Sequence, residues 1–329
     1  MSKVAVVILN FNGRDYLNRF LPSLITHTPD AELIVADNAS TDDSLELLKT
    51  EFPTIRRIEM SENSGFAGGY NVALKEVKAD YFVLLNSDVE VVKGWLAPMV
   101  DFLDSNSSYA VCQPKILDFN KQDHFEYAGA SGGFLDMFGF PFCRGRVFNK
   151  IEADQGQYDS AIDISWASGA CMMVRANTFF NANGFDVDFF AHMEEIDLCW
   201  RIQRAGSRIK CIPNSTVYHV GGGTLSKSSP LKTYLNFRNG LNLLVKNMPL
   251  RSLVWKFPVR VLLDWVAALK FLFEGGTLHA LAVIRAHGKV ALGLFGTLRK
   301  RSKPSRDITK DYSIVVRHFL RKQNRYSNL

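Results

Sequence analysis

Several common signatures are missing from this 329-residue sequence. Its five cysteines are odd in number and none stands at C-x-x-C spacing, which favours reduced thiols over a disulfide framework or a zinc site. There is no G-x-x-x-x-G-K-[ST] loop, and the glycine-rich turn at residues 63–71 neither follows the first strand nor reads G-x-G-x-x-G. These absences exclude a P-loop NTPase and a plain dinucleotide-binding dehydrogenase.

Long uncharged apolar runs are also scarce. The run at residues 4–9 is short and ends at Asn10-Phe11-Asn12, so we expect a first strand there rather than a signal peptide. With 47% hydrophobic and 22% charged residues, the composition is typical of a globular protein.

What the sequence does contain is an alternation of strand-like and helix-like segments. The strand-like runs are residues 4–9, 32–36, 55–60, 81–88 and 109–116, and the segments with helical spacing are 15–27, 44–52, 63–78 and 95–103. Alternation with short connections predicts an α/β fold with a mostly parallel sheet and helices on both faces. Residues 119–163 show no period, and such a long excursion is usually a binding loop or lid.

Carboxylates end two of the expected strands. Asp37 follows the second strand, and Asp88 closes the run 81–88 after Asn86. Parallel strands bring their carboxyl ends to one edge of the sheet, where α/β proteins bind ligands. The alternative for Asp37 is an N-cap or Asx turn, and a lone strand ending in Asp88 is commonly structural.

Further along, Glu194, Glu195 and Asp197 lie in the first turn of an expected helix. They suit the helix dipole, which is a purely structural explanation. Like charges this close also raise a pKa, which a general base working near neutral pH requires. His219 stands just before a triple glycine; a lone histidine is more often structural than functional.

Taken in order, these residues resemble the family 2 glycosyltransferases, which are inverting enzymes with a GT-A fold, and most closely the rhamnosyltransferase-like branch that builds bacterial surface polysaccharides. The resemblance covers residues 1 to about 225. The motifs that carry it are Val7-Ile-Leu-Asn-Phe-Asn12, Val35-Ala-Asp-Asn-Ala-Ser-Thr-Asp42, Asn63-Ser-Gly-Phe-Ala-Gly-Gly-Tyr-Asn71, Leu84-Leu-Asn-Ser-Asp88, Gly184-Phe-Asp186, Glu194-Glu-Ile-Asp-Leu-Cys-Trp-Arg201 and His219.

The resemblance implies a role for each position. Asp37 meets the nucleobase of a nucleotide-sugar, and the donor pocket is completed by Asn10, Asn38, Asn63, Gly65, Asn71 and Asn86. Asn86 replaces the first aspartate of the family's D-x-D signature, which leaves Asp88 and His219 to hold Mn²⁺ or Mg²⁺, partly through the donor's own phosphates. Glu195 stands where the family has its catalytic base, usually an aspartate; Glu194 or Asp197 is the alternative base.

The C-terminal quarter, residues 226–329, has a different character. Residues 253–273 and 278–298 are apolar, but Lys256, Arg260 and Asp264 recur every four residues, which fits an amphipathic helix at a membrane interface better than a transmembrane span. The basic tail from Arg299 suits anionic lipid. The alternative is a helical pair packed on the catalytic domain (residues 1–225) or on a second subunit, giving a homodimer.

These observations predict a cytoplasmic glycosyltransferase, peripherally bound to the inner face of the membrane, that moves a sugar from dTDP-rhamnose or a UDP-sugar to a lipid-linked glycan. A nucleotidyltransferase has no need of the carboxylates at 194–197. A non-catalytic sugar- or lipid-binding module with a decayed site is favoured by Asn86 and Glu195. Nucleic-acid binding is not expected, because the tail lacks a stacking platform of interleaved aromatic residues.

Overall fold

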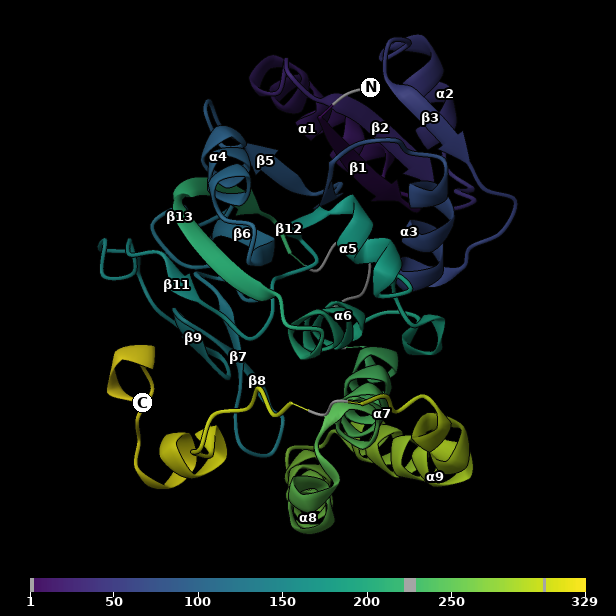
Figure 1. The fold of residues 1–329 in the computed structure, drawn as a ribbon. Helices are drawn as coiled ribbons and strands as arrows, with labels where there is room; N and C mark the ends of the chain where they lie inside the picture. The colour runs from purple at the N-terminus through teal and green to yellow at the C-terminus, as the bar shows by residue number, and fades with distance from the viewer. Residues whose placement is uncertain (1–2, 222–228, 304–305) are drawn as a thin grey trace.

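A computed structural model describes residues 3–221, 229–303 and 306–329 (Figure 1). Within them, a nine-stranded sheet runs in the order β11–β13–β6–β12–β4–β1–β2–β3, and β5 pairs with β13. Its strands are β1 (Val4–Asn10), β2 (Glu32–Asp37), β3 (Arg56–Glu59), β4 (Tyr81–Asn86), β5 (Val89–Val91), β6 (Tyr109–Asp118), β11 (Ile162–Asp163), β12 (Cys171–Arg175) and β13 (Arg208–His219).

The predicted α/β architecture is confirmed. Strand β1 pairs in parallel with β2 and β4, β2 with β3, and β6 with β13, whereas β12 runs antiparallel between β4 and β6. Successive β1 residues alternate between two apolar cores, so both faces of the sheet are covered. The covering helices are α1 (Arg14–His27), α2 (Ser44–Thr50), α3 (Gly65–Lys75), α4 (Ala97–Ser105), α5 (Ala176–Asn181) and α6 (Glu194–Arg204).

The excursion at 119–163 is more ordered than a loop or lid. It contains a second, four-stranded antiparallel sheet made of β7 (Gly133–Leu135), β8 (Pro141–Cys143), β9 (Arg146–Val147) and β10 (Lys150–Ile151). Strands of two or three residues are too short to show a period, which explains why they could not be recognised in the sequence. The end of the chain packs on this sheet, with the Phe134 and Tyr326 ring centroids 5.4 Å apart.

Three long helices follow: α7 (Pro230–Asn247), α8 (Leu250–Phe273) and α9 (Thr277–Arg299). Helix α8 begins before Pro258, which therefore lies inside it and does not mark its start. The expected boundary between the two regions, at residue 225, lies outside the described residues. Short helical turns, η1 (Val187–Phe189), η2 (Val316–Leu320) and η3 (Tyr326–Asn328), complete the fold.

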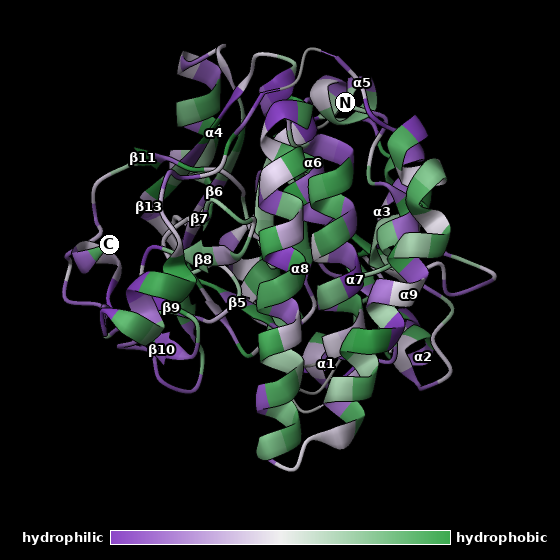
Figure 2. Cartoon of the chain, turned by 90° about the horizontal axis from the view of Figure 1, so that it is seen from below, coloured by the Kyte–Doolittle hydropathy of each residue, from purple (hydrophilic) through white to green (hydrophobic). Residues whose placement is uncertain are grey.

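The polar stripe of α8 faces the protein interior, whereas the polar face of an amphipathic helix at a membrane interface meets water. Lys256, Arg260 and Asp264 are 7%, 3% and 0% exposed. The Arg260 Nε donates to Asp264 Oδ1 at 2.9 Å, and Lys256 Nζ pairs with Asp307 at 3.1 Å. Apolar side chains take the outer face, where Leu262 is 65% and Phe273 90% exposed. Figure 2 shows α8 and α9 side by side, with broad hydrophobic bands toward the turn that joins them.

The basic tail is also less free than expected. Lys300 pairs with Asp186 and Asp188, and the Arg301 guanidinium donates to the carbonyls of Val245 and Met248. Further along, Arg306, Lys310 and Arg317 contact the Gln203 carbonyl, the Phe134 ring and the Tyr312 ring, respectively. Much of the positive charge is therefore held against the rest of the chain.

Candidate active site

A group of polar side chains lies where β1 and β2 end. The Asn10 Nδ2 donates to Asp37 Oδ1 at 3.0 Å and to Ser40 Oγ at 3.1 Å, and Asp37 Oδ2 accepts from the Ser40 N–H at 2.9 Å. The parallel register places Asn10 beside Asp37. Both carboxylate oxygens of Asp37 are thus used within the loop, and the residue is 1% exposed.

A second set of bonds shapes the glycine-rich turn. The Asn38 Nδ2 donates to Asn63 Oδ1 at 3.0 Å and to the Gly65 carbonyl at 3.1 Å, and Asn38 Oδ1 accepts from the Ser64 N–H. Gly65 has φ +70°, and a Cβ there would lie 2.5 Å from the Phe190 ring, so only glycine fits. We call Asn10, Asp37, Asn38, Asn63 and Asn71 the asparagine cluster.

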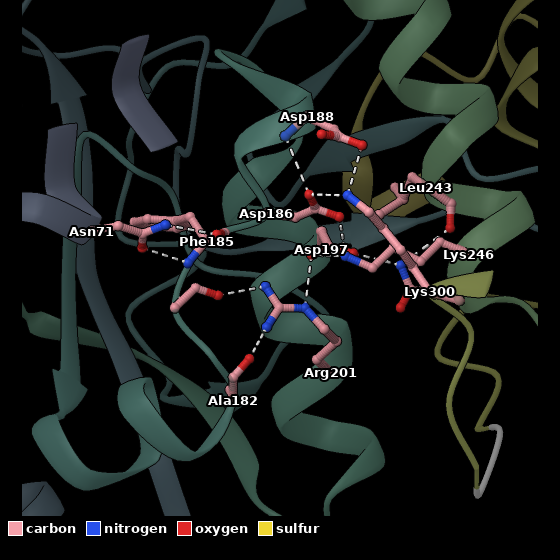
Figure 3. Close-up of polar contacts among 12 residues, drawn as sticks. Asn71, Ala182, Phe185, Asp186, Asp188, Asp197, Arg201, Leu243, Lys246 and Lys300 are labelled. Carbon is pink, nitrogen blue, oxygen red and sulfur yellow. Dashed lines mark hydrogen bonds and ion pairs between the residues drawn. The ribbon is translucent and has the colours of Figure 1, made fainter. Parts of the chain in front are cut away.

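Asn71 fastens this part of the chain to the segment that precedes α6. Its Nδ2 donates to the Phe185 carbonyl at 2.8 Å and its Oδ1 accepts from the Phe185 N–H at 2.9 Å (Figure 3). The bonds place its amide against the Gly184-Phe-Asp186 motif. Because both amide atoms bond to the Phe185 backbone, Asn71 would shape the predicted donor pocket by holding this motif in place.

The predicted metal ligands do come together. Strand β5 pairs with β13 so that Val89 lies opposite His219, which sets the His219 Nε2 3.1 Å from Asp88 Oδ1. The Asn86 Nδ2 lies 3.4 Å from the same ring nitrogen. On the other side of the ring, Glu126 Oε1 is 3.4 Å from His219 Nδ1. Asp88, His219 and Glu126 are each less than 10% exposed, and we call them the carboxylate–histidine cluster.

Opposite charges inside this cluster determine its protonation. Burial disfavours the imidazolium, but the carboxylates of Glu126 and Asp88 outweigh burial and raise the pKa of His219 to about 10. Burial likewise disfavours the charged form of Asp88, but His219 and the Gly221 N–H lower its pKa below the usual value. A positive imidazolium therefore balances the negative charge of Asp88.

The residues present fit a divalent ion as two of its ligands. A carboxylate and an imidazole with adjacent donor atoms suit Mn²⁺ or Mg²⁺, which prefer oxygen-rich shells and keep several water or phosphate ligands. Among the described residues, no three His, Cys, Asp or Glu side chains are arranged to hold an ion alone. An ion beside Asp88 would take its remaining ligands from donor phosphates and water.

Two carboxylates at the start of α6 carry raised pKa values. Burial, with the charges of Glu195 and Asp197, raises the pKa of Glu194 well above its usual value. Burial also raises the pKa of Glu195 to about 7, although hydrogen bonds from backbone N–H groups at the helix start act to lower it. Each has a buried Oε2 with no hydrogen-bond partner. Glu195 is partly exposed and Glu194 is 4% exposed, so Glu195 is the better placed to meet a substrate.

Asp197 has a different environment from its neighbours. Its Oδ1 accepts from Asn247 at 2.8 Å, and its Oδ2 accepts from Arg201 Nε at 2.8 Å and pairs with Lys246 Nζ at 2.9 Å (Figure 3). Burial opposes its charge, but these cations outweigh burial and lower its pKa. Both oxygens are committed, so Asp197 anchors α6 to α7 and is not available as a base.

The turn that leads into α6 is strained. Phe190, His192 and Met193 have φ of 64°, 69° and 74°, which non-glycine residues rarely adopt. The buried Asn239 of α7 holds it, because its Nδ2 donates to the carbonyls of Phe189 at 2.9 Å, Ala191 at 2.9 Å and His192 at 2.7 Å. The Phe190 carbonyl also accepts from the Phe66 N–H at the start of α3.

The sequence reasoning missed four residues that support this site: Glu126, Asn239, Lys246 and Asn247. The first lies in the segment without a period, and the others lie 47–50 residues from the carbonyls and the carboxylate that they hold at the start of α6. Such pairs leave no mark in a single sequence. The Asp197–Arg201 pair was within reach, since an i,i+4 spacing is recognisable.

Comparison of the sequence with known proteins identifies the family to which the chain belongs. The profile described as Glycosyl transferase family 2 matches residues 5–177, a little over half of the chain. Rhamnosyltransferase WbbL of Escherichia coli (strain K12) is 28% identical over 225 residues, covering 66% of this chain and 83% of that protein. N-acetylglucosaminyl-diphospho-decaprenol L-rhamnosyltransferase of Mycobacterium tuberculosis (strain ATCC 25618 / H37Rv) is 25% identical over 233 residues, covering 65% and 75%.

Solved structures agree on the fold. The mannosyltransferase PcManGT from Pyrobaculum calidifontis, in complex with GDP-Man and Mn²⁺, matches with a TM-score of 0.55 and 14% identity, covering 91% of this chain and 83% of that one. GalNAc-T7 with UDP, GalNAc and Mn²⁺ matches with a TM-score of 0.58 and 17% identity, covering 74% and 48%. The chain therefore belongs to glycosyl transferase family 2 and is a rhamnosyltransferase-like glycosyltransferase with the GT-A fold.

Proposed function

We propose that this enzyme transfers a sugar from dTDP-rhamnose or a UDP-sugar to a lipid-linked glycan acceptor, with inversion, in bacterial surface polysaccharide synthesis. The names of the two bacterial relatives, one of which specifies a diphospho-decaprenol substrate, support this kind of acceptor and sugar. The observation that carries the proposal is the placement of Glu195, which is partly exposed in the first turn of α6 and has an Oε2 with no hydrogen-bond partner.

The chemistry divides between the two ends of the site. Glu195 accepts the proton of the acceptor hydroxyl, whose oxygen forms a bond to the anomeric carbon while the bond from that carbon to the diphosphate oxygen breaks. Single displacement inverts the anomeric centre. Asp88 and His219 would hold Mn²⁺ or Mg²⁺, which neutralises charge on the leaving diphosphate. The asparagine cluster keeps the shape of the pocket for the nucleotide.

The direct experiment follows nucleoside diphosphate release from a panel of sugar nucleotides with Mn²⁺ or Mg²⁺ and lipid-linked acceptors. Wild-type turnover that disappears in Asp88→Asn and Glu195→Gln, but persists in Glu46→Gln at an exposed position of α2, is the expected result. NMR of the product should show an anomeric configuration opposite to that of the donor. Retention of configuration would contradict the single-displacement mechanism.

A non-catalytic binding module remains the second candidate, favoured by Asn86 at a position where the family has an aspartate. Under that hypothesis the wild-type protein binds sugar nucleotides but releases no nucleoside diphosphate with any donor or acceptor. The buried Oε2 of Glu195, which has no hydrogen-bond partner and which a decayed site has no reason to keep, argues for the enzyme.

We also propose that α8 and α9 dock on the inner face of the cytoplasmic membrane. Their outward side chains include some of the most exposed large apolar residues of the described chain: Val254, Leu262, Val266, Phe273, Leu278, Leu292 and Phe295. The charged side chains of Lys256, Arg260 and Asp264 in α8 turn inward, which is the arrangement expected beside an apolar solvent. Helix α9 alone among the described helices is long and apolar enough to cross a membrane. The competing occupant of this surface is a second copy of the chain.

Liposome co-sedimentation of the full-length protein separates these two occupants. The double variant Leu262→Ser/Phe273→Ser should lose binding to anionic vesicles, whereas Ile25→Ser, on an exposed apolar position of α1, should bind as the wild type does. If the wild-type protein does not bind vesicles and sediments as a dimer, while the double variant is a monomer, the partner of this surface is a second subunit and not the membrane.

A further inference from the structure

Glu126 is a buried carboxylate placed behind a predicted metal ligand. It is 4% exposed, and its Oε1 lies 3.4 Å from His219 Nδ1, whereas the other ring nitrogen, Nε2, faces Asp88. Its second oxygen, Oε2, accepts the Ala128 N–H at 2.5 Å. The carboxylate therefore meets the edge of the imidazole that does not face Asp88.

The backbone fixes Glu126 relative to the histidine. The Glu126 N–H donates to the Ile116 carbonyl on β6 at 3.0 Å, and β6 pairs in parallel with β13, which ends at His219. The Phe119 N–H in turn donates to the His219 carbonyl at 3.0 Å. Gly221 leaves room for the carboxylate, since a Cβ there would lie 3.0 Å from Glu126 Oε1.

Other partners do not account for this placement. Arg146 is close enough for Glu126 to contribute to its raised pKa, after burial and Cys143. Its hydrogen bonds, however, go to Cys143 Sγ and the Phe148 carbonyl. Among the described residues, no hydrogen bond to His219 Nδ1 competes with Glu126. The carboxylate is thus the available partner for that nitrogen.

A histidine binds a metal ion through one ring nitrogen, and a carboxylate at the other nitrogen fixes the tautomer and the ring orientation. We propose that Glu126 is a positioning residue that holds the proton on His219 Nδ1 and aims Nε2 at the ion beside Asp88; this inference rests on the proposed metal-dependent function. The chain has the neutral Asn86 in place of a second carboxylate ligand. The negative charge of Glu126, next to His219 Nδ1, makes the histidine a stronger donor to the ion and compensates in part for the missing carboxylate.

The test measures Mn²⁺ affinity, by EPR of the free ion, in the presence of UDP and separately of dTDP. Glu126→Gln keeps the side-chain shape and the bond to Ala128 but removes the charge, and should weaken Mn²⁺ binding by about 10- to 100-fold. The matched control is Glu152→Gln, in the same excursion, whose carboxylate accepts from the Tyr158 hydroxyl and the Tyr326 N–H. It should bind Mn²⁺ as the wild type does.

A second variant and a second readout guard against a merely structural effect. Glu126→Asp keeps the charge but shortens its reach, so it should also weaken Mn²⁺ binding while nucleotide binding without metal stays unchanged. In ¹⁵N NMR with Mg²⁺ and UDP, His219 should carry its proton on Nδ1 in the wild type and lose this single tautomer in Glu126→Gln.

The outcomes distinguish this inference from the proposed function. If the wild type binds no Mn²⁺ with either nucleotide, metal dependence itself fails. If the wild type binds Mn²⁺ and Glu126→Gln binds it equally well with the same His219 tautomer, only the role of Glu126 is overturned.

Discussion

The asparagine cluster and the start of α6 are both buried polar regions, but they differ in how many of their polar atoms have partners. In the cluster, the amides of Asn38 and Asn71 and the carboxylate of Asp37 have partners within the fold, and only Asn10 Oδ1 is buried without one. At α6, the Oε2 atoms of Glu194 and Glu195 have none, and both carboxyl groups have raised pKa values.

This difference indicates that the asparagine cluster maintains the shape of the site, whereas the start of α6 carries the reactive groups. A satisfied polar network stabilises one conformation and has little capacity left to react. An unpartnered buried carboxylate costs free energy of folding, and such costs are typical of sites that bind or transform a ligand. We therefore expect changes at α6 to reduce turnover and changes in the asparagine cluster to reduce stability.

The largest expected effect comes from Glu195→Gln. Removing a general base typically lowers the rate by about 10²- to 10⁴-fold, so kcat should fall by that much while nucleotide affinity is unchanged. Initial rates of nucleoside diphosphate release, with affinities from calorimetry, provide the measurement. If instead Glu194→Gln abolishes turnover and Glu195→Gln does not, the base is the other carboxylate.

A smaller loss is expected from Asn239→Ala, which removes the clamp on the strained turn. The backbone that carries Glu195 should relax, and a misplacement of about 1 Å lowers a rate by roughly 10²-fold. The loss should appear in kcat more than in KM. Asn236→Ala, a half-buried position on the same helix, serves as the control and should keep its rate. Equal losses in both variants would show a general effect on α7.

The smallest effect on turnover is expected from Asn38→Ala. It leaves the Ser64 N–H without its partner and removes one of the two donors to Asn63 Oδ1, which should lower the free energy of unfolding by about 1–3 kcal/mol. Denaturant unfolding measures this, with Asn18→Ala on the exposed face of α1 as the reference. A variant that keeps full stability but loses turnover would place Asn38 among the residues that act on the substrate directly.

The sequence predicted the parts of this fold that depend on local pattern. The apolar runs of β1, β2 and β4 identified the sheet, and their alternation with helices predicted the parallel pairing that the structure has. The contact between Asp88 and His219 was predicted only through the family resemblance. In the structure, the pairing of β5 with β13 brings these two residues together.

What the sequence could not supply depends on distant contacts. The period of Lys256, Arg260 and Asp264 showed that they share one face of α8, but not that this face turns inward, since that depends on Asp307 and the neighbouring helices. In the same way, nothing near Glu126 indicated its contact with His219, 93 residues further along the chain by their numbers.

The pH dependence of kcat tests the account most directly. A base must be deprotonated to accept a proton, so with a Glu195 pKa of about 7 the rate should rise as pH increases through about 7 and level off above it. In Glu195→Asp, whose carboxylate is placed differently, the midpoint should move. A wild-type rate that is flat between pH 5 and 8, or a midpoint that stays the same in Glu195→Asp, would contradict the assignment of Glu195 as the base.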